Sequence, residues 1–205
     1  MIKAIYFDFD GVLTIDSSGT LSVLTYISKR TSIPFDVLNT SYRKWNQDLL
    51  LGLITHVEIW NAFCTDIGEC IDFALLQEAY RNTPLDHSML SFVSDLKSNY
   101  RIGLITDNKE DRIAEILSYF RIADLFDSVT VSAACGYRKN QTSIFEEALY
   151  SLDVTSQDSV FIDNDASNLI VPSAMGMKTV WFDDHTRDIP LLQNSLYEIL
   201  SAHSV

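Results

Sequence analysis

The spacing of hydrophobic residues divides this chain into three parts. The N-terminal run at residues 2–7 is largely apolar and aromatic, which predicts a buried β-strand that ends at Asp8. No strand pattern follows between residues 16 and 82, where apolar residues recur at helical spacing. The pattern predicts four helices there, at about residues 21–27, 35–45, 55–63 and 73–80, the third with a capping box at Thr55 and Glu58. We therefore expect a small helical bundle inserted directly after the first strand.

From residue 84 onward, short apolar runs alternate with amphipathic segments. The runs predict strands at residues 101–105, 129–131, 159–162 and 178–182, and the segments between them predict helices. Asp86 and Asn108 are expected to cap the two helices that follow them. Strands that alternate with helices form parallel sheets with right-handed crossovers. The predicted fold is therefore α/β: a Rossmann-like parallel sheet core at residues 1–15 and 84–205, with an inserted all-helical domain at residues 16–83.

The composition excludes several classes of protein. The formal net charge is −13 over 205 residues, which argues against non-specific nucleic-acid binding because such binding needs a basic surface. Apolar runs fall short of the ~20 residues of a membrane span, and the N-terminus lacks a signal-peptide pattern. The three cysteines show no metal-ligand spacing and are expected to be reduced thiols. We therefore expect a soluble cytoplasmic protein without nucleic-acid or membrane partners, either a monomer or a homodimer.

Polar side chains follow three of the predicted strands. Asp8 and Asp10 end the first strand, Thr106 ends the second, and Asp163 ends the run at residues 159–162. In parallel α/β sheets, ligands bind outside the carboxyl ends of the strands, where such residues converge. Asp8 and Asp10 are followed by Gly11 and have no lysine or arginine beside them in the sequence, which suggests a hard cation such as Mg²⁺. The alternative for these two aspartates alone is an ordinary turn.

Four short motifs follow one another along the chain. They are DFDGVLT at residues 8–14, ITDN at 105–108, GYRK at 136–139 followed by Ile144 and Phe145, and FIDN at 161–164 with Asn168 and Gly176. Together they resemble the motifs of the haloacid dehalogenase-like (HAD) superfamily of hydrolases. One such motif is weak evidence, but four in order at suitable spacing are specific. The resemblance covers nearly the whole chain and implies that the helical insertion is a cap of the type that follows the first strand.

The resemblance also implies a chemistry for the motifs. Asp8 would attack phosphorus to form an aspartyl-phosphate, and Asp10 would protonate the leaving oxygen and then activate water. Thr106 and the backbone amide of Asp107 would bind the phosphoryl group, and the cation of Lys139 would complete that site. Mg²⁺ would be held by residues of the first and fourth motifs, namely Asp8, Asp10, Asp163 and Asn164.

Three assignments stay open at the level of the sequence. Arg138 is a rival to Lys139, although the spacing from Gly136 favours Lys139. Many family members carry a second acid in the fourth motif, where this chain has Asn164. Asp165 is then the alternative neighbour of the metal, with N-capping of the next helix as its competing role. The histidines show no mutual spacing, so all four are expected to lie at the surface or to cap helices: His56, His87, His185 and His203.

These residues favour a Mg²⁺-dependent phosphatase that hydrolyses a small phosphorylated metabolite. A phosphomutase of the same superfamily also needs Asp8 and Asp10 and stays an alternative. A dehalogenase has no use for an acid at Asp10, and a phosphonate hydrolase needs a cap lysine in an apolar setting, which neither Lys29 nor Lys44 has. A non-catalytic binding or regulatory protein would be expected to lack Asp8, Asp10 or Lys139, and all three are present.

Overall fold

A five-stranded sheet forms the centre of the protein in the computed structural model, which describes residues 1–202. All its strand pairs are parallel, and the strand order is β3-β2-β1-β4-β5. The strands are β1 (Ala4–Phe7), β2 (Arg101–Thr106), β3 (Ser128–Val131), β4 (Ser159–Asp163) and β5 (Lys178–Trp181). The predicted parallel α/β sheet is thus confirmed, with strand bounds close to those expected.

The first strand lies in the middle of this sheet. Phe7 pairs with Leu104 of β2 on one side and with Ile162 of β4 on the other. Every residue of β1 is buried, as expected of a strand that is covered on both faces. Its carboxyl end therefore lies between the carboxyl ends of two other strands.

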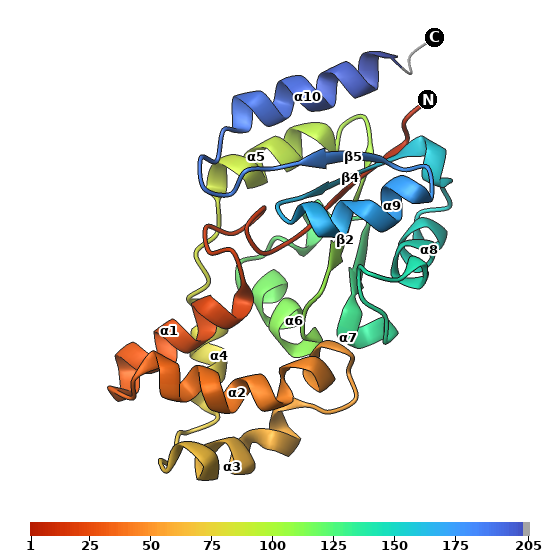
Figure 1. Cartoon of the computed structure of the whole chain (residues 1–205). Helices are drawn as coiled ribbons and strands as arrows, with labels where there is room; N and C mark the ends of the chain where they lie inside the picture. Colours follow the sequence, from red (N-terminus) through yellow and green to blue (C-terminus); the bar gives the residue numbers. More distant parts are fainter. Residues whose placement is uncertain (203–205) are drawn as a thin grey trace.

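Helices cover both faces of the sheet (Figure 1). Because side chains alternate along a strand, Ile5 and Phe7 pack into one apolar cluster and Ala4 and Tyr6 into the other. The first cluster includes residues of α5 (His87–Leu96), α6 (Glu110–Tyr119) and α10 (Ile189–Ala202). The second includes residues of α8 (Thr142–Ser151) and borders α9 (Ile170–Ala174). Short helical segments connect these elements: η1 (Ala123–Leu125), α7 (Ser132–Cys135), η2 (Ser156–Asp158) and η3 (Ala166–Leu169).

Four helices lie between β1 and α5, grouped beside one end of the sheet (Figure 1). They are α1 (Gly19–Thr31), α2 (Phe35–Leu50), α3 (His56–Ile67) and α4 (Ala74–Arg81). The predicted capping box is present, because Thr55 accepts from the Glu58 amide while the Glu58 carboxylate accepts from the Thr55 amide. Their apolar faces join the same cluster that covers the first face of the sheet, so the inserted helices share part of the core.

The chain enters and leaves the inserted helices through two adjoining segments. Thr14 and Leu85 form an isolated antiparallel bridge, flanked by a hydrogen bond of 2.8 Å from the Ile15 amide to the Pro84 carbonyl. Asp86 caps α5 as predicted, because its side chain accepts from the Met89 amide. The division into a core of residues 1–15 and 84–205 and a cap of residues 16–83 stays a prediction, which this crossing supports.

Two predictions about individual side chains were wrong. Lys109, not Asn108, occupies the N-cap position of α6, and no side chain caps that helix. Asn108 instead points back toward the carboxyl end of β1, as described below. His56 is buried rather than exposed, at 2% of its maximal accessibility, because it is enclosed by Tyr42 and Tyr80 of neighbouring helices. None of the helices within residues 1–202 combines the length and the apolar character needed to cross a bilayer.

Candidate active site

The carboxyl ends of β1, β2 and β4 border one pocket of about 290 Å³. Its lining includes Asp8, Thr106 and Asn164 from the strand ends, together with Gly19 of α1 and Leu50 of α2. The pocket therefore lies between the sheet and the inserted helices. Of the residues predicted for the site, Asp10, Asp107 and Lys139 also line it, so the topology brings these separate motifs together.

A tight turn places Asp8 and Asp10 at the mouth of β1. The Asp8 amide still donates to the Ile162 carbonyl of β4, at 2.9 Å, so Asp8 continues the strand. Gly11 adopts a left-handed conformation with φ of +79°, and its amide donates to the carbonyl of Asp16. A Cβ atom there would lie 2.3 Å from the Asn164 side-chain nitrogen, so the turn needs glycine for both its backbone conformation and its close packing.

Lys139 joins two of the strand ends. Its Nζ lies 2.8 Å from Asp8 Oδ1 and 2.7 Å from Asp163 Oδ2, and its side chain is almost fully buried. Burial by itself lowers the pKa of Lys139, but the carboxylates of Asp8, Asp163 and Asp107 together raise it above its usual range. Lys139 is therefore a permanent cation in an acidic protein, as the third motif predicts.

Arg138, the rival of Lys139, points elsewhere. Its Nε donates to Asp107 Oδ2 at 2.9 Å, and its Nη1 donates to Gln47 of α2. The other oxygen of Asp107 accepts from the Lys139 amide, also at 2.9 Å. The Asp107 carboxylate thus shapes the loop that carries both cations, and only Lys139 reaches Asp8.

Asp8 is a buried carboxylate paired with Lys139. Burial raises its pKa to about 7, opposed by the nearby Lys139 and reinforced by the negative charge of Asp163. Its buried Oδ1 atom has the Lys139 ammonium as its charged neighbour, at 2.8 Å. Asp8 and Asp163 are thus two carboxylates beside one cation, and a further hard cation bound there would offset their repulsion.

Asp163 is held rigidly at the end of β4. Its Oδ1 accepts a hydrogen bond of 2.7 Å from the Asp165 amide, and Asn168 donates to both carboxylate oxygens at 3.2 Å. The side chain is fully buried. Asp8 and Asp163 are therefore two fixed carboxylates that share one ammonium group.

Asn164 and Asp165 have different partners. The Asn164 side-chain nitrogen donates to Asp184 Oδ2 at 3.3 Å. The Asp165 carboxylate accepts from both the amide and the hydroxyl of Ser167, which makes it the N-cap of η3. These hydrogen bonds also lower the pKa of Asp165. The capping role that competed with metal binding at Asp165 is thus the one seen in the structure.

The side chain of Asp10 is held by Arg112 in the first turn of α6 and by Asn108, which precedes that helix. Arg112 Nη2 lies 2.8 Å from Asp10 Oδ1 and Arg112 Nη1 lies 2.9 Å from Asp10 Oδ2, a bidentate pair. Asn108 donates to Asp10 Oδ2 at 2.8 Å and accepts from Arg112. Sequence reasoning missed Arg112, which lies in the first turn of α6, just after the second motif.

Thr106 is nearly fully buried at the end of β2, where its hydroxyl oxygen accepts from the Asn108 side chain at 3.3 Å. It lines the pocket together with Asp107. Within residues 1–202, histidine, cysteine, aspartate and glutamate side chains form no cluster of three arranged to hold a metal ion. The predicted metal ligands therefore divide into Asp8 and Asp163, which share Lys139, and Asp10 and Asn164, whose side chains have other partners.

Comparison of the sequence with known protein families identifies the family of this chain. Residues 2–176 match a family model described as haloacid dehalogenase-like hydrolase. A glyceraldehyde 3-phosphate phosphatase from Pyrococcus abyssi is 34% identical over 84 residues, 40% of this chain and 35% of that protein. The chain thus spans about a third of the length of the first curated relatives that it matches.

Solved structures show the same fold at low sequence identity. A HAD family enzyme from Bacteroides thetaiotaomicron, solved with magnesium and inorganic phosphate, is 17% identical with a TM-score of 0.70, over 90% of this chain and 96% of that one. An L-2-haloacid dehalogenase from Xanthobacter autotrophicus, with chloropropionic acid covalently bound, is 16% identical with a TM-score of 0.66, over 89% and 78%. At these identities the likeness concerns the fold alone.

Proposed function

The chain belongs to the haloacid dehalogenase-like hydrolases, and we propose that it is a Mg²⁺-dependent phosphatase that hydrolyses a small phosphorylated metabolite through an aspartyl-phosphate. The observation that carries this proposal is the buried Lys139 ammonium, which lies within 2.8 Å of a carboxylate oxygen of both Asp8 and Asp163. In this proposal Asp8 is the nucleophile, Lys139 is the cation beside it, and Asp163 is a second carboxylate at the same edge of the sheet.

Asp8 is the nucleophile in this mechanism. One of its carboxylate oxygens attacks phosphorus, so that a bond from Asp8 to phosphorus forms while the bond from phosphorus to the leaving oxygen breaks. Lys139 offsets the negative charge that gathers as an anionic phosphate approaches an anionic carboxylate. Its short distance to Asp8 supports that role.

Asp10 moves protons in both half-reactions. In its protonated form it gives a proton to the leaving oxygen, and as a carboxylate it then takes a proton from the water that attacks phosphorus. The second attack breaks the bond between phosphorus and Asp8 and releases inorganic phosphate, which restores both aspartates. Asp10 lines the pocket, while Arg112 and Asn108 hold its side chain at rest.

Thr106 and the Asp107 amide are proposed to bind the phosphoryl oxygens. The Thr106 hydroxyl lies at the carboxyl end of β2, on the edge of the pocket, and Asp107 follows it directly. Both donors precede α6, whose N-terminal amides favour a negative charge. Phosphate would then contact donors from β2 on one side and Lys139 on the other.

The residues present fit a bound Mg²⁺. Two buried carboxylates, Asp8 and Asp163, share the single ammonium group of Lys139, so their negative charge exceeds the positive charge beside them. Asp8, the Asp10 backbone carbonyl and Asp163 would hold the ion, with Asn164 as a neutral neighbour. When bound, Mg²⁺ would neutralise part of the charge shared by Asp8 and the phosphoryl oxygens.

The proposal is tested with purified full-length protein and p-nitrophenyl phosphate. We expect phosphate release that requires Mg²⁺ and stops with EDTA, and we expect no turnover by Asp8→Asn, because an amide cannot attack phosphorus. Asp8→Asn should unfold at a temperature no lower than the wild type, since it removes a buried charge. Turnover by a folded Asp8→Asn protein would exclude the covalent mechanism. A phosphomutase would instead pass the phosphoryl group from Asp8 to a hydroxyl group of its substrate and yield little free phosphate.

A further inference from the structure

The Lys109 side chain is largely buried, at 7% exposed, and it lies at the start of α6. Within residues 1–202 its Nζ makes no hydrogen bond or ion pair and instead faces the Tyr42 ring, while its backbone amide donates to Asn108. Its Nζ lies 5.4 Å from the centroid of the Tyr42 ring in α2, which fixes its direction. Burial, and then the positive charge of Arg112, lower the pKa of Lys109 to about 7. Holding an amine in this way costs stability, so a compensating role is expected.

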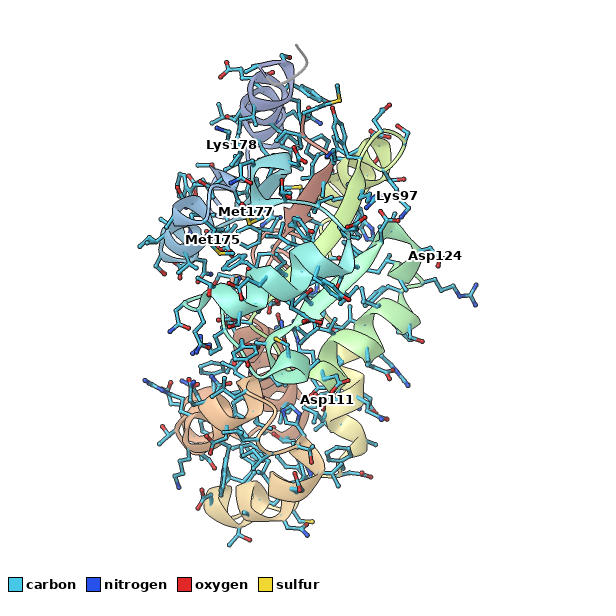
Figure 2. All side chains as sticks on the ribbon, turned by 90° about the vertical axis from the view of Figure 1, so that its right-hand side faces the viewer. Lys97, Asp111, Asp124, Met175, Met177 and Lys178 are labelled. Atoms are coloured by element: carbon cyan, nitrogen blue, oxygen red, sulfur yellow. The ribbon has the colours of Figure 1, made fainter. Side chains whose placement is uncertain are left out.

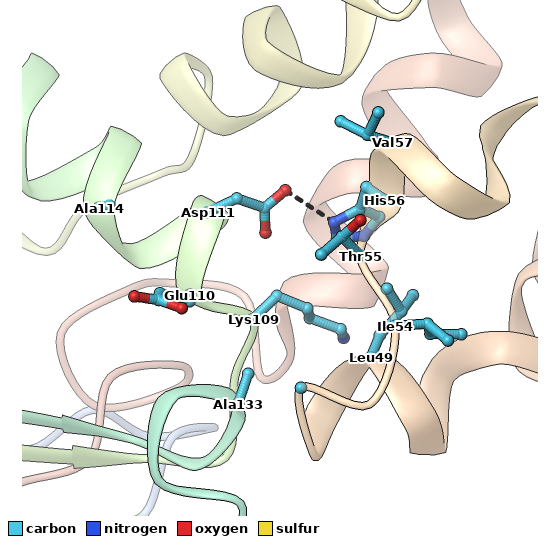
Figure 3. Close-up of a pocket in the computed structure, with 11 residues that line it drawn as sticks. Leu49, Ile54, Thr55, His56, Val57, Lys109, Glu110, Asp111, Ala114 and Ala133 are labelled. Carbon is cyan, nitrogen blue, oxygen red and sulfur yellow. Dashed lines mark hydrogen bonds and ion pairs between the residues drawn. The ribbon is translucent and has the colours of Figure 1, made fainter.

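The position of Lys109 connects two cavities. It lines the catalytic pocket, and it also lines a second cavity of about 480 Å³ between α6 and the inserted helices. Figure 3 shows its side chain reaching toward Leu49 and Ile54, while the Glu110 carboxylate points away from it. The cavity is therefore next to the pocket of Asp8, with the lysine at the boundary.

The second cavity is mostly apolar, and the polar side chains of His56, Asp111 and Thr55 in its lining have partners within the protein. Apolar lining comes from both sides, namely Leu49, Ile54, Val57, Ala114 and Ala133. His56 Nδ1 lies 2.7 Å from Asp111 Oδ2, a contact drawn in Figure 3. The Thr55 hydroxyl interacts with Glu58. Among the residues that line this cavity, Lys109 is thus the cation left to meet a ligand.

We propose that this cavity holds the part of the substrate beyond its phosphoryl group, and that Lys109 donates to a carboxylate there. The substrate class is then a small phosphomonoester whose largely apolar carbon body ends in a carboxylate. This inference rests on the proposed phosphatase function, which it makes more specific.

The local contact with Lys109 favours a singly charged carboxylate over a phosphate or a neutral group. One ammonium matches one negative charge, whereas a second phosphate would bring up to two charges beside Asp111 and Glu110, which also line the cavity. A neutral hydroxyl or amide would accept a hydrogen bond but would leave the lysine charge uncompensated. A carboxylate satisfies both the hydrogen bond and the charge.

The test compares matched substrates rather than a single activity. We would use 4-carboxyphenyl phosphate with 4-carbamoylphenyl phosphate, and 3-phosphooxypropanoate with its amide, so that each pair differs in one charge. The wild type should prefer the acid of at least one pair in kcat/KM. Lys109→Met should reduce that preference by about tenfold or more, mainly by raising KM for the acid, as expected for a lost hydrogen bond to a charged group.

Two further measurements make the result unambiguous. Lys29→Met removes the same charge from an exposed position of α1 and should keep the wild-type preference. Lys109→Met should melt no lower than the wild type, because methionine fills a similar space without a buried amine. An unchanged acid preference in Lys109→Met, or no preference in the wild type, would overturn the inference and leave the phosphatase function standing. A wild type inactive on every one of these phosphomonoesters and on p-nitrophenyl phosphate would overturn both.

Discussion

Arg112 holds Asp10 through two hydrogen bonds, of 2.8 and 2.9 Å, from a guanidinium that is itself almost fully buried. Paired donors of this kind fix the plane of a carboxylate as well as its position. Arg112 also packs against Gly19 of α1, where a Cβ atom would lie 2.4 Å from its Nη1. The residue proposed to move protons is therefore oriented by α6 and closed in by the first inserted helix.

Replacement of Arg112 should impair the chemical step more than substrate binding. We expect Arg112→Lys, which cannot form the bidentate pair, to lower kcat by about tenfold or more, within the range attributed to general acid–base catalysis. Arg43→Lys, at an exposed position of α2, is the control. An unchanged kcat in folded Arg112→Lys would show that the role of Asp10 does not depend on this arginine.

The contact of Asp111 in α6 with His56 and Tyr80 of the inserted helices should contribute to the stability of the fold. Asp111 lies where α6 meets the inserted helices (Figure 2), and its Oδ2 accepts from Tyr80 at 3.1 Å and lies 2.7 Å from His56 Nδ1. Asp111→Ala would leave two buried polar groups with fewer partners, which typically costs about 1–3 kcal/mol. We expect a lower melting temperature, measured by calorimetry or circular dichroism.

The matched control for Asp111 is its neighbour. Glu110→Ala removes a charge from the same first turn of α6, but Glu110 is exposed and does not contact His56. Its effect should stay below about 1 kcal/mol, the usual range for exposed charges. Equal destabilisation by the two variants would mean that the helix terminus, not the contact with His56 and Tyr80, is responsible.

The buried amine of Lys109 should make stability depend on pH. Its pKa is lowered to about 7 in the folded protein, from about 10.4 in an unfolded chain. Between these values the unfolded chain binds more protons, so the free energy of unfolding rises with pH. The stability contribution is present above the unfolded pKa and is lost as pH falls through the folded pKa.

Lys109→Met lacks the titrating amine, so comparing its stability with that of the wild type isolates the pH-dependent contribution of Lys109. Its melting temperature relative to the wild type should be highest at pH 7 and below, and the difference should shrink toward pH 10. Measurements at pH 6, 7, 8.5 and 10 in one buffer series would follow the change. A difference that stays constant over this range would show that Lys109 titrates at its ordinary value.

The sequence predicts what depends on periodicity and topology. The apolar run before Asp8 predicts a buried strand, and the alternation after residue 84 predicts parallel neighbours for it. Parallel pairing alone then brings the ends of β1, β2 and β4 to one edge. Asp8, Thr106 and Asp163 were found in this way, and the third motif added Lys139, whose side chain contacts both aspartates.

The sequence did not predict the side-chain contacts that depend on how α6 packs against the inserted helices. Arg112 is 102 residues from Asp10 in the chain, and His56 is 55 residues from Asp111. A periodic pattern predicts that a helix has a buried face, but it does not indicate which distant polar group that face meets. Asn108 resembles an N-cap from its position after a strand, yet hydrogen bonds to Asp10 and Arg112 determine its conformation.

The remaining prediction concerns Asn164, which places an amide directly after Asp163 at the carboxyl end of β4. Mg²⁺ favours charged oxygen ligands, so Asn164→Asp should lower the Mg²⁺ concentration needed for half-maximal activity. The Asn164 side chain also donates to Asp184, and a carboxylate there would repel it. The double variant Asn164→Asp with Asp184→Asn avoids that repulsion by exchanging the two side chains.

Asp165→Asn separates metal binding from helix capping. Both hydrogen bonds from Ser167 end on one oxygen, Oδ1 of Asp165, which an asparagine amide can replace. This variant should therefore keep the helix cap and the melting temperature, and it should not change the Mg²⁺ requirement greatly. The Mg²⁺ requirement is measured as activity at increasing Mg²⁺ concentration. The melting temperature of the phosphate-free protein is measured over the same Mg²⁺ concentrations. The opposite result would be that Asp165→Asn strongly weakens Mg²⁺ binding, while Asn164→Asp, alone or with Asp184→Asn, has no effect on it. Asp165 would then be the neighbour of the metal, and its hydrogen bonds to Ser167 would have to break when the ion binds.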